Sequence, residues 1–307
     1  MPLIRQIRRR RRPHGKVAAG RRQAALAACV LASILVWWSP PIPTPRILER
    51  WPAPDAGFSA WEPLFQGVDH AKADYRTPRP MKCHAVRLDL TAPGLSFFVK
   101  PSDGARPQET DSQFTSSFLR QHGLQFAVSS SAFFPFAKWP GVPVDVIGLA
   151  VSEGDRYSEA VPNLDSLVVT RDNHARFVRA GGDTSDAWNG AGGNLMVLSD
   201  GIDRGEDLAT EAASAAGISA DGRYLYWLVV DGRQKGWSEG ADPHDSARLL
   251  RQLGASGALN FDGGSVVTMA RQGRWFGATV MNRPCHPYFT GFERPIGGIL
   301  GVRARPL

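Results

Sequence analysis

The chain has 307 residues, a formal net charge of +7 and three cysteines. This length exceeds that of most single domains, although α/β domains of about 200 to 250 residues are common. Nine lysines and arginines fall within residues 5–22, a stretch without an acidic residue, and subtracting these nine from +7 leaves −2 for the rest of the chain. The basic balance therefore concerns membrane topology and anionic lipid headgroups, and we expect no nucleic-acid partner.

The amino terminus predicts a membrane anchor. Residues 1–23 form a basic tail, and residues 24–38 follow without a charged side chain. No Ala-x-Ala site follows, and Trp37 and Trp38 suit the membrane interface, which favours an uncleaved transmembrane signal anchor over a cleaved signal peptide. The positive-inside rule then predicts a single-pass protein of the inner (cytoplasmic) membrane, with a cytoplasmic tail and a periplasmic or extracellular C-terminal domain.

The segment after the anchor is rich in Pro, Ala and Trp. It spans residues 39–80 and contains the runs PPIPTP, WPAPDAG and TPRP. This composition predicts a mostly extended, Pro-rich linker. The folded domain is then expected over residues 81–307.

Short elements are predicted in the first half of this domain. Alternating apolar and polar residues between 83 and 99, with a Pro-Gly turn, predict the two strands of a hairpin. A short helix is expected over residues 114–122, ended by Gly123. Further strands are expected within residues 124–136, 146–151 and 164–170.

The clearest strand comes later, at residues 223–231. Its sequence, RYLYWLVVD, is apolar on both faces, as expected of a central strand covered on both sides. Asp242 and Pro243 then begin a helix that Gly254 ends, and a second strand follows at residues 258–261. Strand, helix and strand together predict a βαβ unit.

The fold class predicted from these elements is α/β (α+β). We expect a mixed central sheet with a C-terminal βαβ unit, closed by a glycine-rich strand at residues 296–302 and preceded by the transmembrane anchor. The βαβ unit brings Asp231 and Asp262 to equivalent carboxyl ends of strands, the edge at which open α/β sheets bind ligands.

Both aspartates are followed by glycine. Asp-Gly is also a common turn dipeptide, so Asp231 has a plain turn as its alternative interpretation. Asp262 is preceded by apolar residues and followed by Gly263 and Gly264, which allow a ligand to approach the main chain. Together with Glu239, the two aspartates are also candidate oxygen ligands for Ca²⁺, although nothing in the sequence requires a cofactor or a metal.

A nucleophile-elbow pattern, G-x-S-x-G, occurs at residues 236–240 with Ser238 at its centre. Asp262 and His286 follow in the order of a hydrolase triad. An elbow serine sits at a strand-to-helix corner, whereas Ser238 comes seven residues after Asp231 and four before Asp242. A serine hydrolase is therefore the less favoured hypothesis.

Cys83 and Cys285 are the two cysteines of the exported part. They are a candidate disulfide in an oxidising compartment, with two separate buried thiols as the alternative. Each is followed by histidine, but adjacent ligands rarely reach one ion, so we expect no metal there. Near the C-terminus, Arg294 either pairs with Glu293 at the surface or presents its guanidinium to a phosphate.

The run LVVDGRQKGWSEGADPHDSARLLRQLGASGALNFDGG and the later ERPIGGILGV resemble the phosphodiester glycosidase family. The resemblance extends over residues 82–302 and is strongest from Tyr224 onward. FAVSSSAFF resembles a family strand that ends in an Asn-Gly-Phe-Phe type motif, and the segment from Gly193 to Gly201 resembles the family's Gly-Gly-x-x-Leu-x-x-x-Gly stretch. Bacterial members are often associated with exopolysaccharide biosynthesis.

The sequence departs from the family at three polar positions. Ser130 stands where the family has asparagine, Ala213 where it has arginine, and Val266 where it has a small or hydroxyl residue. These departures carry the alternative hypothesis, a membrane-tethered glycan- or phosphoglycan-binding protein that has kept the fold and lost the chemistry.

The resemblance implies hydrolysis of a sugar C1–O–phosphate bond in a carbohydrate or phosphoglycan substrate. It makes Asp262 the base or nucleophile, with Glu239 or Asp231 as the second carboxylate. The residues expected to bind phosphate or sugar are Gly263, Gly264, Ser265, Arg294, Ser238, Ser130 and Asn194.

Overall fold

The computed structural model describes residues 50–104, 107–273 and 277–307. The predicted tail (1–23) and signal anchor (24–38) lie outside these residues. In the described part of the chain, no helix combines the length and apolar character that a membrane span requires. All described residues belong to one compact unit, Pro40–Leu307.

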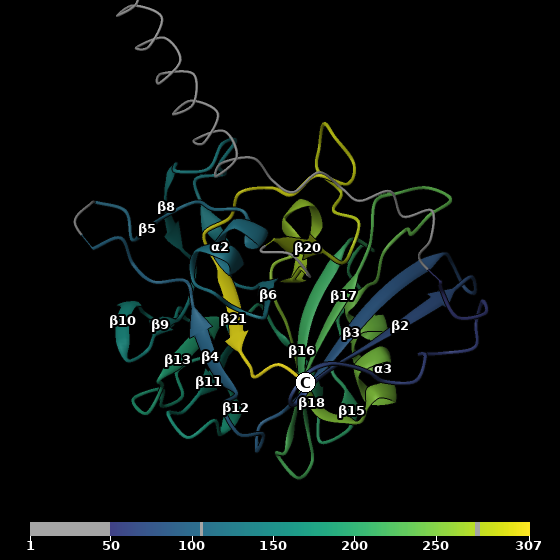
Figure 1. The fold of residues 1–307 in the computed structure, drawn as a ribbon, viewed down its shortest axis with the longest axis horizontal. Helices are drawn as coiled ribbons and strands as arrows, with labels where there is room; N and C mark the ends of the chain where they lie inside the picture. The colour runs from purple at the N-terminus through teal and green to yellow at the C-terminus, as the bar shows by residue number, and fades with distance from the viewer. Residues whose placement is uncertain (1–49, 105–106, 274–276) are drawn as a thin grey trace, which may run out of the picture. The chain divides into compact units, whose positions relative to one another are not determined.

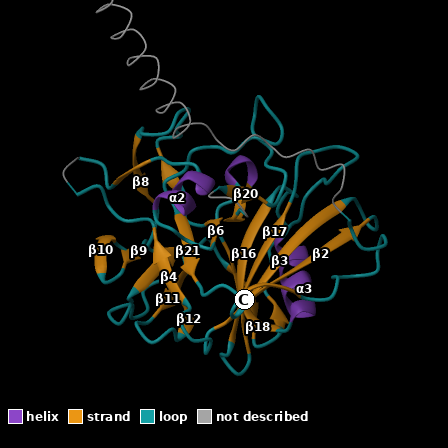
Figure 2. Ribbon diagram, viewed as in Figure 1, coloured by secondary structure: helices purple, strands orange, loops and turns teal. Residues whose placement is uncertain are grey.

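The largest sheet has eight strands, and every pair of neighbours in it is antiparallel. Strands dominate the fold and helices are few (Figure 2), so the class is a sheet-dominated α+β fold. In spatial order the eight strands are Glu62–Phe65 (β1), Val68–Tyr75 (β2), Met81–Asp89 (β3), Tyr224–Val230 (β17), Ala213–Ser219 (β16), Ala255–Asn260 (β18), Met196–Ser199 (β14) and Ile202–Asp203 (β15).

β17 lies inside this sheet because both of its faces are apolar. Every residue after Tyr224 in YLYWLVV is buried, and Trp227 is fully buried. The strand pairs with β3 on one side, Trp227 opposite Val86, and with β16 on the other, Trp227 opposite Ala216. The predicted central strand is confirmed.

The helix of the predicted βαβ unit is α3 (Pro243–Leu253). Asp242 and Asp245 form a reciprocal capping box at its start, Pro243 occupies the first turn, and Gly254 ends it in a left-handed conformation. Its buried face, which includes Leu249 and Leu250, packs on the eight-stranded sheet (Figure 1). The local signals for this helix are therefore confirmed at both ends.

β17 and β18 run in the same direction but are not neighbours. β16 lies between them and is antiparallel to both. The expectation of a mixed sheet is therefore wrong, because the inserted strand makes all neighbouring pairs antiparallel. The consequence expected for the site still holds, since Asp231 and Asp262 follow the carboxyl ends of strands that point to the same edge.

Two five-stranded sheets and one three-stranded sheet complete the fold. The second sheet consists of Ala278–Val280 (β20), Met269–Gln272 (β19), Phe126–Ser129 (β6), Ile299–Arg303 (β21) and Ser96–Val99 (β4). The third consists of Asp155–Ser158 (β10), Ala150–Ser152 (β9), Asn189–Gly192 (β13), Ser166–Val169 (β11) and Ala175–Val178 (β12). The smallest consists of Thr110–Asp111 (β5), Pro143–Val146 (β8) and Phe133–Phe134 (β7).

The main hydrophobic core joins the three larger sheets. It combines Trp227 of β17 with Phe126 of β6, whose rings stack 5.4 Å apart, and with Leu167 of β11. A second cluster lies between the eight-stranded sheet and α3, and a third lies between the second sheet and the predicted short helix, α2 (Thr115–Gln121). This core fixes the eight-stranded sheet against the second sheet, beside the strand ends that carry the site.

Two expectations for the front of the domain are wrong. Residues 39–80 are not all linker, because β1 and β2 lie within them and β2 pairs with β3 along its whole length. The hairpin expected over residues 83–99 does not form either. β3 is occupied on both edges by β2 and β17, so β4 pairs with β21 in the second sheet instead.

Candidate active site

The main chain around Asp262 links the first two sheets. After β18, the Phe261 amide donates to the carbonyl of Ser214, at the start of β16, over 2.8 Å. The Asp262 amide then donates to the carbonyl of Ser130, which follows β6, over 3.0 Å. Gly264, in the 3₁₀ turn η2 (Gly264–Val266), donates back to the carbonyl of Ala212 over 2.7 Å. Three hydrogen bonds from two sheets therefore fix the position of the Asp262 side chain.

The Asp262 carboxylate is partly buried and accepts a single hydrogen bond. One oxygen accepts the Gly263 amide over 2.9 Å, and the other has no hydrogen-bond partner among the described residues. Burial raises the pKa of Asp262 from 3.8 to about 6, against the lowering effect of the Gly263 amide, and the charge of Glu211 adds to the rise while Arg294 and Arg233 oppose it. A carboxyl group with a free oxygen and a pKa near 6 is suited to proton transfer near neutral pH.

Glu211 and Arg233 form an ion pair directly beside the two glycines. A Cβ on Gly263 would lie 2.8 Å from Glu211 Oε1, and a Cβ on Gly264 would lie 2.7 Å from Arg233 Nη2. Gly264 also has a φ of +70°, a conformation that favours glycine. The glycines thus let a second carboxylate and a guanidinium approach the Asp262 turn.

A second guanidinium is bonded to the turn at Ser265. Arg294 Nη1 donates to Ser265 Oγ over 2.8 Å, and its guanidinium carbon lies 4.9 Å from the centre of the Phe136 ring. Arg294 does not pair with Glu293, so that alternative is wrong. Glu293 is buried and accepts from the amide and hydroxyl of Ser116, because its backbone packs beside the start of α2. This leaves the Arg294 fork available to an anion.

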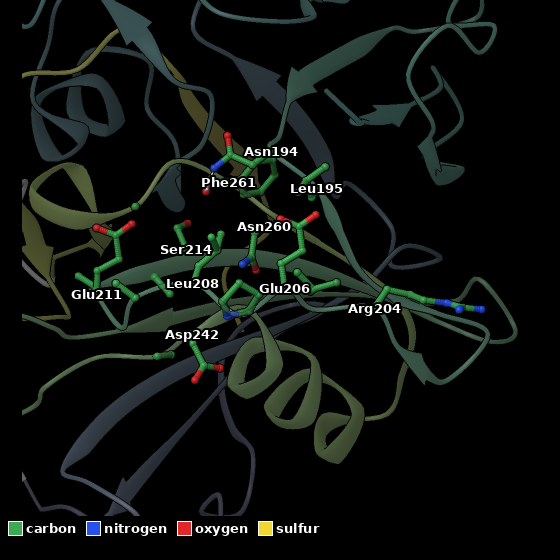
Figure 3. A pocket seen from close by; sticks show the side chains of 17 residues that line it. Asn194, Leu195, Arg204, Glu206, Leu208, Glu211, Ser214, Asp242, Asn260 and Phe261 are labelled. Atoms are coloured by element: carbon green, nitrogen blue, oxygen red, sulfur yellow. Dashed lines mark hydrogen bonds between the residues drawn. The ribbon is translucent and has the colours of Figure 1, made fainter. Parts of the chain in front are cut away.

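A cavity of about 100 Å³ opens beside Gly263, between β18, the start of β16 and residues 204–212. Figure 3 shows Glu211 at one end of it, with Ser214 and Asn260 in its middle. Asn194 is held at the rim by donating its side-chain amide to the carbonyl of Phe261 over 3.1 Å. Within the described part of the chain, Asn260 Oδ1 and Ser130 Oγ are buried and have no hydrogen-bond partner among the protein atoms.

Asp231 does not join this constellation as a reactive group. Its side chain is fully buried and accepts the Trp237 indole N–H over 3.0 Å, the Asn282 amide over 3.3 Å and the Arg283 main-chain amide over 2.7 Å. Both oxygens therefore hold neighbouring loops together. These bonds give Asp231 a structural part in the loops, and the catalytic role expected for it stays a prediction.

Ser238 and Glu239 also lie apart from the reactive groups. Ser238 is fully buried, donates its hydroxyl to the Asp231 carbonyl over 2.5 Å and accepts the Lys82 amide over 2.9 Å. Its burial and its two hydrogen bonds argue against a nucleophilic or substrate-binding role, and both expectations stay untested. Glu239 is exposed, and its carboxylate makes no hydrogen bond or ion pair with the described residues.

Cys83 and Cys285 are both free and buried, as in the alternative of two separate thiols. Cys83 packs in the cluster beneath α3, whereas Cys285 belongs to the main core, so they occupy different clusters. Among the described residues, no group of three or more His, Cys, Asp or Glu side chains is placed to hold a metal ion. The Ca²⁺ ligands considered from the sequence are thus not gathered into one cluster.

The side chains that the turn does bring together are two carboxylates, two guanidiniums and the hydroxyl of Ser265. Asp262, Gly263, Gly264, Ser265 and Arg294 were expected from the sequence. Glu211 and Arg233 were not. Arg233 directly follows the Asp231-Gly232 turn, so its position beside the site was accessible to strand-end reasoning, whereas Glu211 lies in GEDLATEAA, which has no motif.

This arrangement is chemically asymmetric. Besides burial, the charge of Glu211 raises the pKa of Asp262, whereas the charges of Arg294 and Arg233 lower it, and Arg294 is held by its bond to Ser265. A carboxyl group beside two guanidiniums can exchange a proton with a reacting oxygen while the guanidiniums hold an anion.

Comparisons with known proteins identify the family of this sequence and relatives of its fold. Residues 122–303 match the model of a family described as phosphodiester glycosidase. No curated protein matches the sequence. The matched segment contains Asp262 and all its side-chain neighbours named above.

Three solved structures share the fold. The catalytic domain of zebrafish N-acetylglucosamine-1-phosphodiester alpha-N-acetylglucosaminidase, auto-inhibited by its pro-peptide, aligns with a TM-score of 0.60 and 16% identity over 81% of this chain and 87% of its own. A hypothetical protein from Synechocystis aligns with a TM-score of 0.55 and 14% identity over 78% and 62% of the two chains. A protein of Burkholderia pseudomallei named as exported aligns with a TM-score of 0.53 and 14% identity over 73% and 74%.

Proposed function

Because the chain belongs to the phosphodiester glycosidase family, we propose that it hydrolyses the bond between C1 of a sugar and the phosphate of a sugar-1-phosphodiester or phosphoglycan. The observation that supports this proposal is the Asp262 carboxylate, which has one oxygen without a hydrogen-bond partner among the described residues and a pKa raised by burial, with two guanidiniums in electrostatic reach. In this proposal the body of the protein acts outside the cytoplasm, anchored through residues 24–38, in exopolysaccharide or cell-envelope metabolism.

The proposed reaction needs a carboxylate to accept a proton and positive charge to stabilise the phosphate. Water attacks C1, the C1–O bond breaks, and the bond electrons leave with the phosphate monoester. The water proton passes to a carboxylate, and the sugar is released with a free C1 hydroxyl. A phosphate monoester is already a good leaving group, so charge stabilisation of the phosphate matters more than protonation of the leaving oxygen.

We assign Asp262 as the base or nucleophile and Glu211 as the second carboxylate, in place of Glu239 and Asp231. In this assignment Arg294 and Ser265 bind the phosphate, and Arg233, which pairs with Glu211, adds a second positive charge near it. Asn194, which lines the cavity, and Ser130, whose carbonyl accepts the Asp262 amide, are proposed as the residues nearest the sugar.

The two guanidiniums supply the positive charge that a metal would otherwise supply at a phosphate. We therefore propose a reaction that requires no metal cofactor, and we expect activity to survive dialysis against a chelator. The sugar proposed first is N-acetylglucosamine, since this is the sugar in the name of the zebrafish protein of the same fold.

A second candidate function is glycan or phosphoglycan binding without turnover. The observation in its favour is Ala213, which stands where the family resemblance leads us to expect arginine and whose small side chain lines the cavity. Val266, the other apolar departure, is buried in the cluster around α2 and presents no hydroxyl group.

One experiment separates the two functions. The full-length protein is incubated with the methyl phosphodiesters of N-acetylglucosamine, glucose and mannose 1-phosphate, with and without chelator, and free sugar and methyl phosphate are quantified. We expect equal amounts of both products from at least one substrate. Calorimetric binding without product from any of them would select the binding protein and contradict the hydrolase.

A further inference from the structure

Glu211 lies where three glycine-containing loops pack directly against it. A Cβ on Gly240, before α3, would lie 2.3 Å from the Glu211 carbonyl oxygen, and a Cβ on Gly232, after β17, would lie 2.1 Å from the amide nitrogen of Ala212. A Cβ on Gly263, after β18, would lie 2.8 Å from Oε1 of the Glu211 side chain. Glycine at these three positions therefore allows the loops to approach Glu211 this closely.

Main-chain hydrogen bonds fix the backbone of Glu211 in this position. Its amide donates to the Ala241 carbonyl over 3.1 Å, and its carbonyl accepts the Ala241 amide over 2.9 Å. The side chain lies at one end of the cavity (Figure 3) and is 42% exposed. A half-exposed glutamate has several rotamers open to it, so the backbone alone does not hold its carboxylate beside Gly263.

Arg233 supplies the contact that holds the carboxylate. Its Nη2 donates to Oε2 of Glu211, and among the described residues Arg233 is the one whose side chain bonds to this carboxylate. The two side chains are 54% and 42% exposed, and an ion pair with this exposure contributes little to stability. The effect expected of the pair is therefore on the place of the Glu211 carboxylate.

The backbone of Arg233 is strained where it makes this contact. Its φ is +56°, and the other described non-glycine residues with positive φ are asparagine or aspartate, apart from Glu153. Arginine tolerates this conformation less well than those residues do. The Arg233 amide donates to the Glu239 carbonyl over 3.2 Å, which helps to hold it there. Such strain is kept where the direction of a side chain matters.

We propose that Arg233 is a positioning residue, which acts on the reaction by holding the Glu211 carboxylate beside the Asp262 turn. The inference rests on the proposed function for the role of Glu211 as the second carboxylate, and it assigns to Arg233 an effect beyond its charge near the phosphate. It predicts that the loss of Arg233 matters mainly while Glu211 is present, whereas a direct contact between Arg233 and the phosphate would matter in either case.

The kinetic test is a double-mutant cycle in the full-length protein. Arg233→Gln, Glu211→Gln and the double variant are compared on the methyl phosphodiester of N-acetylglucosamine 1-phosphate. We expect each single variant to lose about tenfold in kcat/KM, and Arg233→Gln to cost at most about twofold when Glu211→Gln is already present. Losses that multiply in the double variant would show that Arg233 acts independently of Glu211, and would overturn the proposal.

Arg223→Gln is the matched control. Arg223 pairs with Asp89 at the opposite end of β17, and its side chain is 50% exposed. Breaking this ion pair should leave kcat/KM within about twofold of the wild type. A loss as large as that of Arg233→Gln would show that the effect is not specific to the site, which also overturns the proposal.

A titration of the Asp262 carboxyl group tests the positioning without turnover. The full-length protein is labelled with ¹³C at the aspartate carboxyl groups, and the Asp262 signal is assigned by its loss in Asp262→Asn. Burial and the charge of Glu211 both raise the pKa of Asp262. Glu211→Gln should therefore lower this pKa when Arg233 is present and leave it unchanged in Arg233→Gln, where the carboxylate is no longer held nearby.

An equal shift with and without Arg233, or no shift in either case, would overturn the positioning role. The expected shifts do not require that any substrate is hydrolysed. If they appear and no phosphodiester yields product, the proposed function fails while the positioning of Glu211 by Arg233 stands.

Discussion

At the scale of single residues, the site depends on how few hydrogen bonds the Asp262 carboxylate accepts. Its one bond to the Gly263 amide holds the side chain in place without neutralising it, and burial keeps its pKa near 6. Asp231, by contrast, accepts three hydrogen bonds, so both of its carboxylate oxygens are engaged in a buried network. Two aspartates at equivalent strand ends thus have different roles because their neighbours differ.

Asp262→Asn should reduce kcat at least about 1000-fold, because the amide cannot accept a proton or attack C1. In the wild type, kcat/KM should rise with pH up to about 6 and then level, since Asp262 must be unprotonated and its pKa is about 6. The measurements are a pH–rate profile and a thermal unfolding curve. An unchanged profile in a folded Asp262→Asn variant would exclude the assignment.

Gly264→Ala tests the close approach of Arg233 to the turn. A side chain there meets both a positive φ and a guanidinium at 2.7 Å, whereas Gly222, with the same φ of +70°, has no heavy atom within 4 Å of its Cβ position. Gly222→Ala and Gly264→Ala should therefore both cost the strain of about 1 to 2 kcal/mol, and only Gly264→Ala should also lower kcat/KM, because the Arg233 guanidinium must move away from the turn. Urea unfolding and steady-state kinetics measure both, and equal effects of the two substitutions on kcat/KM would contradict this geometry.

Glu293 should make the protein less stable as the pH rises. Burial raises its pKa from 4.5 to about 7, so between these pH values the folded protein retains a proton that the unfolded chain has released. The free energy of unfolding should then fall with rising pH across this window, by on the order of 3 kcal/mol in total. Urea unfolding at several pH values should show a flatter dependence in Glu293→Gln and no change in Glu62→Gln, an exposed control.

At the scale of elements, the sequence predicted what local chemistry determines. The capping residues of α3, the apolar run of β17 and the turn after β18 were all predicted in place, because each depends on neighbouring residues. β2 was missed because VDHAKADY looks polar. Its Asp74 is in fact buried against Lys82, and His70 against His84, so polar partners on the next strand, β3, make this sequence compatible with a sheet interior.

Asp242→Ala should destabilise the protein by about 1 kcal/mol, because it removes the side-chain half of the α3 capping box. For a domain of this size that corresponds to a fall in Tm of about 2 to 4 °C. Asp242→Asn keeps an acceptor for the Asp245 amide and should lose less. Differential scanning calorimetry on the three proteins makes the comparison, and an equal loss in both variants would show that the charge near Arg79 matters more than the cap.

At the scale of the whole molecule, the site exists only because the sheets meet. Ser130 follows β6, Glu211 precedes β16, Arg233 follows β17 and Arg294 precedes β21, and each approaches Asp262 from a different part of the chain. Asp262 was predicted as a site residue because the sequence shows where β18 ends. The sequence could not place Glu211, because the insertion of β16 between β17 and β18 depends on long-range pairing.

The central claim is that this assembly cleaves the bond at C1 of the sugar. Hydrolysis of a sugar-1-phosphodiester in H₂¹⁸O tests it most directly, with mass spectrometry of both products. A glycosidase that directs water to C1 should place the label in the free sugar and none in the phosphate monoester, and Asp262→Asn should release neither product. Label in the phosphate, or release that continues in Asp262→Asn, would contradict the account.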